Sequence, residues 1–284
     1  MIIANRPKLS PEEERMPLAK YYDFPLYPPG PRESQLLKHQ PIDPKDALKV
    51  ANLLDLLEPT GYSDTEYGYC KMPDGSSYMA MYFVYPNCTP KMMGWWFRWL
   101  NIPPKGQPEG TGNLKYKLWC PPDHGTHRFV NGKDISDGMW ATESIDLGKG
   151  MDKVYFLRTH LDAKDYGLSA KREKELLEAG CWVDLSTVTF HSPQDPSQQY
   201  PGSWLWLTLS RPCVQGGLEL RTRLWIGYGA KDGKIYFDKT TPPDLLSEDY
   251  MRMFLIHTTV EHQHLAKLLP ILYAEYSDKP DDLA

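Results

Sequence analysis

The C-terminal part of the chain has the clearest periodic pattern of apolar residues. Between Pro242 and Tyr276, apolar positions recur at helical spacing along one face. They are Leu245, Tyr250, Phe254, Leu265, Leu268 and Leu272. This pattern predicts one long terminal helix whose apolar stripe packs against the rest of the protein.

Upstream of this helix, the pattern predicts mostly short strands. They are rich in apolar, β-branched or aromatic residues and are bounded by Gly, Pro or Asp. The predicted strands cover 68–84, 116–119, 138–147, 153–158, 182–191, 203–209 and 218–228, and further helices are predicted at 44–57, at 90–100 and within 163–179. Many antiparallel strands followed by one long helix favour an α+β fold in which a curved sheet grips that helix.

The N-terminal segment has a different composition. Residues 1 to about 45 are rich in Pro and charged side chains, which predicts an extended arm rather than core. We therefore expect two parts: an N-terminal Pro-rich arm and helix over 1–65, and a catalytic domain over 66–284.

Charge and hydropathy exclude some classes of partner. The 284-residue chain has a net charge of -5 and no cluster of Lys and Arg, so we expect no nucleic-acid partner. No apolar run approaches the length of a membrane span, and the N-terminus has no apolar signal segment. A cytoplasmic protein without a membrane partner is expected.

The five cysteines are widely spaced and form no CxxC pair. An odd number at such spacing predicts neither a disulfide framework nor a thiolate zinc site.

The chain has nine Trp and 18 Tyr. Large amphipathic rings suit a cavity for a flat, hydroxylated ligand, and they equally suit the packing of a large sheet. Trp95, Trp96 and Trp225 are the candidates for a wall of such a ring pocket.

The predicted terminal helix carries polar residues inside its apolar stripe. At 100° per residue, His257, Glu261 and His264 fall within about 60° of Leu268. A buried carboxylate is costly unless it is paired or bound to a metal, and His and Glu at i, i+4 place two ligand atoms on one side of a helix. The pair indicates a metal site or, alternatively, a Glu–His hydrogen bond at a wet edge of the stripe.

Further ligands must come from other segments. His124 and His127 lie in a predicted loop after the 116–119 strand, where imidazoles reach a cavity mouth or, alternatively, solvent. Asp123 is placed to orient a histidine by accepting its N–H.

A carboxylate is expected on an inward-facing strand position. Glu143 shares strand parity with Ala141 and Ile145, which puts it on the apolar side, whereas Asp146 has the opposite parity and is the second choice. The alternative is a solvated carboxylate at a strand end.

Four segments, taken in order, carry a family resemblance. They are Tyr116-Lys-Leu-Trp-x-Pro-x-Asp-His124, Glu143-Ser-Ile-Asp-Leu-Gly148, Glu219-Leu-Arg-Thr-Arg-Leu-Trp-Ile-Gly227 and His257-x3-Glu261-x2-His264-Leu-x3-Leu-Pro-x-Leu-Tyr273. Over roughly residues 75 to 276, the chain resembles the diacetylphloroglucinol hydrolase and phloretin hydrolase family.

The resemblance implies a Bet v 1-like (helix-grip) domain, a homodimer and a zinc-dependent hydrolase that cleaves the aryl–acyl carbon–carbon bond of a phenolic ketone. The products would be a phloroglucinol and a carboxylic acid. It implies that one Zn²⁺ per chain is held by His124, Glu143, His257 and Glu261. Tyr116 matches a family tyrosine that binds a phenolic hydroxyl of the substrate. Two imidazoles and two carboxylates also suit Fe²⁺ or Mn²⁺.

The proton that such a cleavage delivers to the ring carbon needs a carrier. His264 and His127 are the candidates because an unperturbed imidazole titrates near neutral pH, and His264 has the alternative role of a hydrogen-bond partner to a ligand.

Two other function classes stay open. A helix-grip carrier could bind phenolics without turning them over, although it has no need of a buried carboxylate. A different metal enzyme, such as an oxygenase or decarboxylase, could use the same ligands.

Overall fold

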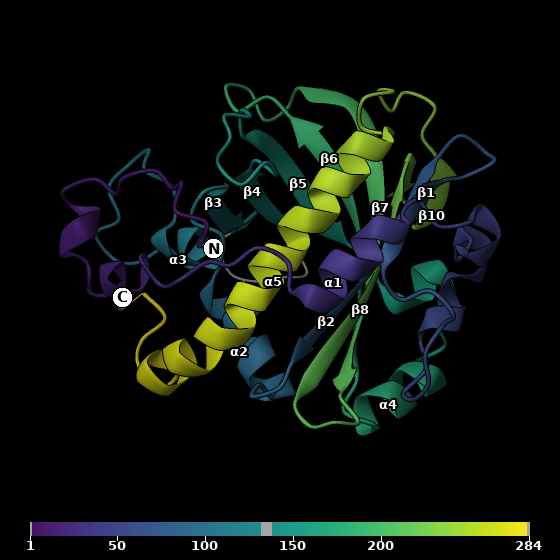
Figure 1. The fold of residues 1–284 in the computed structure, drawn as a ribbon, viewed down its shortest axis with the longest axis horizontal. Helices are drawn as coiled ribbons and strands as arrows, with labels where there is room; N and C mark the ends of the chain where they lie inside the picture. Colours follow the sequence, from purple (N-terminus) through teal and green to yellow (C-terminus); the bar gives the residue numbers. More distant parts are fainter. Residues whose placement is uncertain (1, 132–137, 283–284) are drawn as a thin grey trace.

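The computed structural model describes residues 2–131 and 138–282. An eight-stranded antiparallel sheet, in the order β1-β2-β8-β7-β6-β5-β4-β3, carries the long C-terminal helix α5 (Glu248–Tyr276) across one face (Figure 1). The strands are β1 (Gly68–Lys71), β2 (Ser77–Tyr85), β3 (His124–Phe129), β4 (Met139–Glu143), β5 (Val154–His160), β6 (Trp182–His191), β7 (Gln199–Pro212) and β8 (Leu218–Ile226). β9 (Tyr228–Lys231) and β10 (Lys234–Phe237) form a separate hairpin. The large antiparallel sheet and terminal helix are confirmed, with 68–84 divided into the β1–β2 hairpin.

Helix α5 begins at a well-formed cap. The Ser247 side chain accepts from the Tyr250 backbone N–H, and Glu248 and Asp249 lie in the positive first turn. Residues 242–247, predicted as helix, instead form turns that lead into this cap.

Strand alternation divides the apolar residues between two cores. Met79 and Met81 of β2 face α5, whereas Tyr78 and Ala80 face the opposite core. Trp225 of β8 belongs to the opposite core, where its Nε1 donates to the Leu48 carbonyl at 2.7 Å.

Replacing Trp225 with phenylalanine is therefore expected to affect stability and not catalysis. The substitution leaves the half-buried Leu48 carbonyl without its donor and opens a small void, so unfolding free energy should fall by ~2 kcal/mol. Urea unfolding measures that loss. A tenfold change in kcat/KM of the folded variant would contradict this placement.

The remaining helices are short. They are α1 (Pro31–Leu36), α2 (Pro90–Trp99), α3 (Leu114–Trp119) and α4 (Ala170–Glu178), with 3₁₀ turns η1 (Glu13–Arg15), η2 (Pro17–Tyr21), η3 (Leu37–His39), η4 (Pro44–Asp46), η5 (Val50–Leu56) and η7 (Ala163–Tyr166). The prediction at 90–100 is confirmed. The prediction of one α-helix over 44–57 is wrong: Ala47 is extended and Asn52 departs from helical geometry, while Leu53 and Leu56 pack into the second core. Packing against the sheet overrides the local helical pattern here.

The strand predicted at 116–119 is also wrong, because these residues end helix α3. The Asn113 side chain accepts from the Lys115 N–H and caps this helix. Its buried Leu, Tyr and Trp side chains resemble a strand in composition, and only the capping residue distinguished the two.

The N-terminal segment packs on the rest of the chain. Leu18 and Tyr22 join the core under α5, and Lys20 pairs with Glu275 at 2.7 Å. Helix α1 lies beside α5 (Figure 1), where the Gln263 amide donates to Glu33. The prediction that this segment lies outside the core is therefore wrong for Leu18 and Tyr22.

In α5, the longest described helix, charged residues interrupt the apolar sequence. Arg252, Glu261 and Lys267 all lie within it. Within 2–131 and 138–282, no helix has both the length and the apolar character that crossing a membrane requires.

Candidate active site

Four acidic and imidazole side chains from α5, β3 and β4 converge at one place. His124 Nε2 lies 3.1 Å from Glu261 Oε2 and 3.5 Å from Glu143 Oε2. His257 Nε2 lies 3.7 Å from the same Glu261 oxygen. One ligand atom each from His124, Glu143 and His257 can be chosen within 4.8 Å of one another. The three elements therefore bring together all four ligands that the family resemblance implies.

The register of β3 and β4 explains this convergence. His124 is directly opposite Glu143, and an irregularity in the pairing separates His124 from His127. Residues three apart on a regular strand face opposite sides, whereas a bulge lets both imidazoles face inward. These histidines lie on β3 and not in the predicted loop. Glu143 faces the cavity, as its strand parity predicts.

The surroundings of His124 leave one ring nitrogen free to bind a cation. Its Nδ1 donates to the Tyr116 carbonyl at 3.1 Å, and its ring stacks on the Tyr116 ring. This bond assigns the proton to Nδ1, so Nε2 presents a lone pair. That Nε2 is buried and has no hydrogen-bond partner among the described residues. A lone pair facing the Glu261 carboxylate is unfavourable unless a proton or a cation lies between them.

His257 is held from behind by a buried carboxylate. Its Nδ1 donates to Asp123 Oδ2 at 2.6 Å, which directs Nε2 towards Glu261. Asp123 also accepts from the Ser144 hydroxyl and from the backbone N–H groups of Leu147 and Gly148. This contact matches the orienting role predicted for Asp123.

The charges in this cluster call for a positive partner. Burial raises the pKa of Glu261 to about 8, with His257 lowering it and Glu143 raising it. Burial also raises the pKa of Glu143. Burial favours neutral His257, but Glu261 and Asp123 outweigh it and raise its pKa well above the usual value. A proton on His257 or a bound cation can supply the missing positive charge, and the free His124 Nε2 suits a cation.

Cys120, Asp123 and His257 form a second group with metal-ligand spacing. Burial raises the pKa of the Cys120 thiol to about 12, which disfavours the thiolate that a metal needs. Asp123 is already engaged in four hydrogen bonds. The His124, Glu143, His257 and Glu261 set therefore fits a metal better.

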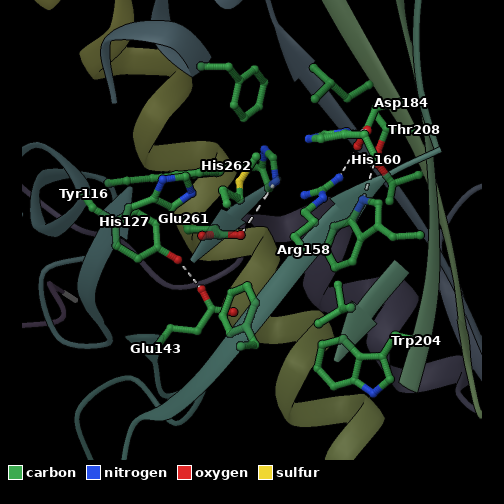
Figure 2. Close-up of a pocket in the computed structure, with 18 of the residues that line it drawn as sticks. Tyr116, His127, Glu143, Arg158, His160, Asp184, Trp204, Thr208, Glu261 and His262 are labelled. Carbon is green, nitrogen blue, oxygen red and sulfur yellow. Dashed lines mark hydrogen bonds and ion pairs between the residues drawn. The ribbon is translucent and has the colours of Figure 1, made fainter. Parts of the chain in front are cut away.

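A cavity opens beside the two carboxylates (Figure 2). Glu143 and Glu261 line it together with Tyr116, His127 and His262. The Tyr116 hydroxyl donates to the Glu143 carboxylate. Burial and the neighbouring Glu143 raise the pKa of Tyr116 well above its usual value, so its hydroxyl stays protonated.

The tryptophans of this cavity are not those expected from the sequence. Trp95 stacks on Trp99, and Trp96 is buried in the core against Trp119. The tryptophans that do line the cavity are Trp119, Trp182, Trp204 and Trp206. Trp204 and Trp206 are two residues apart on one strand, so both lie on the same face of the sheet. This spacing was the signal in the sequence that could have identified them.

The cavity has two histidines near the carboxylates. His127 Nδ1 has no hydrogen-bond partner among the described residues, and burial lowers the pKa of this imidazole to about 3. His262, which the sequence reasoning missed, stacks on Phe83 and contacts the Tyr85 hydroxyl through Nδ1. Its position next to Glu261 was the available signal.

His264 does not line this cavity. Its Nδ1 lies 3.3 Å from the Pro25 carbonyl and its Nε2 lies 3.1 Å from the Leu118 carbonyl. It therefore connects α5 to the N-terminal segment and to α3.

Burial lowers the pKa of His264 to about 4, which predicts an acid-dependent loss of stability. Between pH 6.5 and 4 the unfolded chain binds the proton and the folded chain does not, so stability falls as pH falls. In the His264→Gln variant, the loss from pH 7 to pH 4.5 should be smaller by about 2 kcal/mol. Urea midpoints across this range test it, and an identical pH dependence in the two proteins would contradict it.

Comparison with known proteins agrees with the motifs. The model of the DAPG hydrolase PhiG domain matches residues 48–274. Phloretin hydrolase of Eubacterium ramulus is 24% identical over 286 aligned positions, covering 94% of this chain and 93% of the relative. The 2,4-diacetylphloroglucinol hydrolases of a Pseudomonas species and of Pseudomonas protegens are each 25% identical over 280 positions, covering 92% of this chain and 88% and 84% of the relatives. The chain is thus a hydrolase that belongs to the DAPG hydrolase family.

Proposed function

We propose that this protein hydrolyses the aryl–acyl carbon–carbon bond of acylphloroglucinol-type ketones with one bound divalent metal. The observation that carries the proposal is the convergence of His124, Glu143, His257 and Glu261 at a cavity wall, with the His124 Nε2 lone pair unpartnered. The names of the relatives supply the substrate class, which covers phloretin and diacetylphloroglucinol.

We propose Zn²⁺ as the resident ion, one per chain, because two imidazoles and two carboxylates suit it. Fe²⁺ and Mn²⁺ accept the same ligands and are the alternatives that a metal assay distinguishes. When bound, such an ion supplies Lewis-acid polarisation and lowers the pKa of water. Glu143 and Glu261 face the cavity, whereas His124 and His257 approach the cluster from behind them.

In the reaction, water adds to the ketone carbon, the aryl–acyl bond breaks, and the ring carbon takes a proton. Tyr116 is proposed to hold a ring hydroxyl, because its protonated hydroxyl lies at the cavity wall beside Glu143. His127 is the proposed proton carrier because it lines the cavity with an unpartnered Nδ1; this role requires that bound substrate raise its pKa from about 3 towards neutrality. His264 lies outside the cavity and is better suited to holding α5 in place.

The family assignment also supports proposals about the domain, the oligomeric state and the location of the protein. We propose that 66–284 form a Bet v 1-like helix-grip domain, supported by the single long helix across an antiparallel sheet. Residues 1–65 would form its N-terminal extension, and the protein would be a cytoplasmic homodimer. Light scattering of the purified protein tests the oligomeric state.

One experiment separates this function from its rivals. The purified protein is analysed for metal and incubated without oxygen with phloretin and with mono- and diacetylphloroglucinol, before and after removal of metal by a chelator. Metal-dependent release of a carboxylic acid is expected. Turnover only with oxygen would indicate an oxygenase, and binding with neither metal nor turnover would indicate a carrier.

A further inference from the structure

The cavity has a second polar wall, remote from the proposed metal ligands. Figure 2 shows Arg158, His160, Asp184 and Thr208 gathered on the side opposite Tyr116 and Glu143. These four side chains come from the inward-facing positions of β5, β6 and β7.

Strand register gives the spacing between the two walls. Glu143 is paired with Val154, and Arg158 lies four residues further along the same strand. That separation corresponds to about 13 Å along the backbone, of which the side chains span a part. A substrate group that reaches this wall is therefore remote from the bond that is cleaved.

The charges on this wall already balance one another. Arg158 pairs with Asp184 through Nη2, and its Nε donates to the Ser186 hydroxyl at 2.7 Å. His160 Nδ1 contacts the other Asp184 oxygen. Burial would raise the pKa of Asp184, but Arg158 and His160 hold it at about 2, so this carboxylate is ionised. A further full charge on the ligand would lack a counter-charge here, and a neutral polar group fits best.

Two polar atoms on this wall have no partner within the described part of the chain. Arg158 makes hydrogen bonds through Nε and Nη2, which leaves Nη1 as a donor. His160 Nε2 is buried without a hydrogen bond. In the tautomer in which His160 donates to Asp184 through Nδ1, Nε2 carries a lone pair and is an acceptor. Both side chains contact Asp184, and together their free donor and free acceptor are the complement of a hydroxyl group, which both accepts and donates.

Aromatic rings flank these atoms. Phe97 stacks on Trp182 with ring centroids 6.0 Å apart, and the Arg158 guanidinium lies 5.0 Å from the Trp206 ring centroid. All three rings line the cavity. They offer flat apolar surface for an aryl group that carries the hydroxyl.

We propose that Arg158 and His160 form a subsite for a neutral phenolic hydroxyl of the substrate, remote from the bond that is cleaved. This inference rests on the proposed function and adds a specificity-determining pair to it. The hydroxyl has two possible sources: the phloroglucinol ring, or an aryl group at the end of a long acyl chain. A short acetyl group could not carry it.

The test compares kcat/KM for three ketones: phloretin, phloretin without the hydroxyl on its acyl-side ring, and phloretin without the ring hydroxyl para to the acyl group. In the unmodified protein, loss of the hydroxyl that occupies the subsite should lower kcat/KM by about ten- to a hundredfold, the range for a hydrogen bond to a charged group. In Arg158→Gln and in His160→Gln, the ratio of kcat/KM for phloretin to kcat/KM for the ketone without that hydroxyl should fall to about three or less. Whichever of the two ratios falls shows whether the bound hydroxyl belongs to the phloroglucinol ring or to the ring on the acyl side.

Arg128→Gln is the matched control, because Arg128 is an exposed arginine on β3, which β4 separates from β5, and it should keep both ratios. If Arg158→Gln does not fold, because Asp184 loses a partner, His160→Gln decides. Hydrolysis with both ratios unchanged in the folded variants would overturn the subsite and leave the proposed function standing. Absence of hydrolysis of every ketone by the metal-loaded, unmodified protein would overturn both.

Discussion

The Glu261→Gln variant is expected to lose essentially all hydrolase activity while keeping its fold. The substitution removes one carboxylate charge from the proposed metal ligands and hardly changes the side-chain volume. Loss of several kcal/mol of metal-dependent stabilisation of the transition state corresponds to a fall in kcat/KM of about a thousandfold or more. Metal content should fall in parallel.

Its fold should survive because burial already disfavours the charged form of Glu261. Circular dichroism and thermal unfolding check this, and elemental analysis measures bound metal. Glu275→Gln is the matched control, since Glu275 lies on the same helix and pairs with Lys20 at the surface. Full activity and full metal content in Glu261→Gln would disprove the ligand assignment.

The Asp123→Asn variant is expected to bind the metal more weakly and to be less stable. Each Asp123 oxygen accepts two hydrogen bonds: Oδ1 from Ser144 and Gly148, and Oδ2 from His257 and Leu147. Whichever way an asparagine amide turns, its NH₂ group meets two donors. Removal of such an orienting partner lowers metal affinity by about 10- to 100-fold, and the unsatisfied donors cost about 1–3 kcal/mol of stability.

Competition with a chelator of known affinity measures the change in metal affinity. Urea unfolding of the metal-free protein measures the change in the free energy of unfolding. Asp146→Asn is the control, because Asp146 accepts from Gly148 and Met151 in the same loop without contacting His257. It should lose stability and keep its metal affinity. Equal metal affinity in Asp123→Asn and the unmodified protein would show that Asp123 does not orient a ligand.

The local pattern of apolar and polar residues was enough to predict those helices and strands whose periodicity matched their environment in the folded protein. The terminal helix, helix α2 and strand β6 lie within about six residues of their predicted bounds. The local pattern was not enough at 44–57, where packing against the sheet replaced an α-helix with 3₁₀ turns, or at 116–119, where a cap at Asn113 made a helix of strand-like residues.

The tryptophan predictions failed for a related reason. Composition shows that aromatic residues are available, but only the assembled structure decides which face each one takes: Trp95 and Trp96 pack into the core from helix α2, and strand parity places those on the sheet. Trp225 therefore lies in the second core, while Trp204 and Trp206 line the cavity.

By itself, the sequence determined that a buried helix would carry His257 and Glu261 one turn apart, because helical spacing is a local property. It also carried, in the order of its motifs, the identity of the family. Only the tertiary structure decided that His124 and His127 lie on the same side of β3, both against the Tyr116 ring, because a bulge in the β3–β4 pairing changes strand parity. The same holds for His264, which packs on the N-terminal segment, and for the Arg158 and His160 wall, which exists only where three paired strands meet.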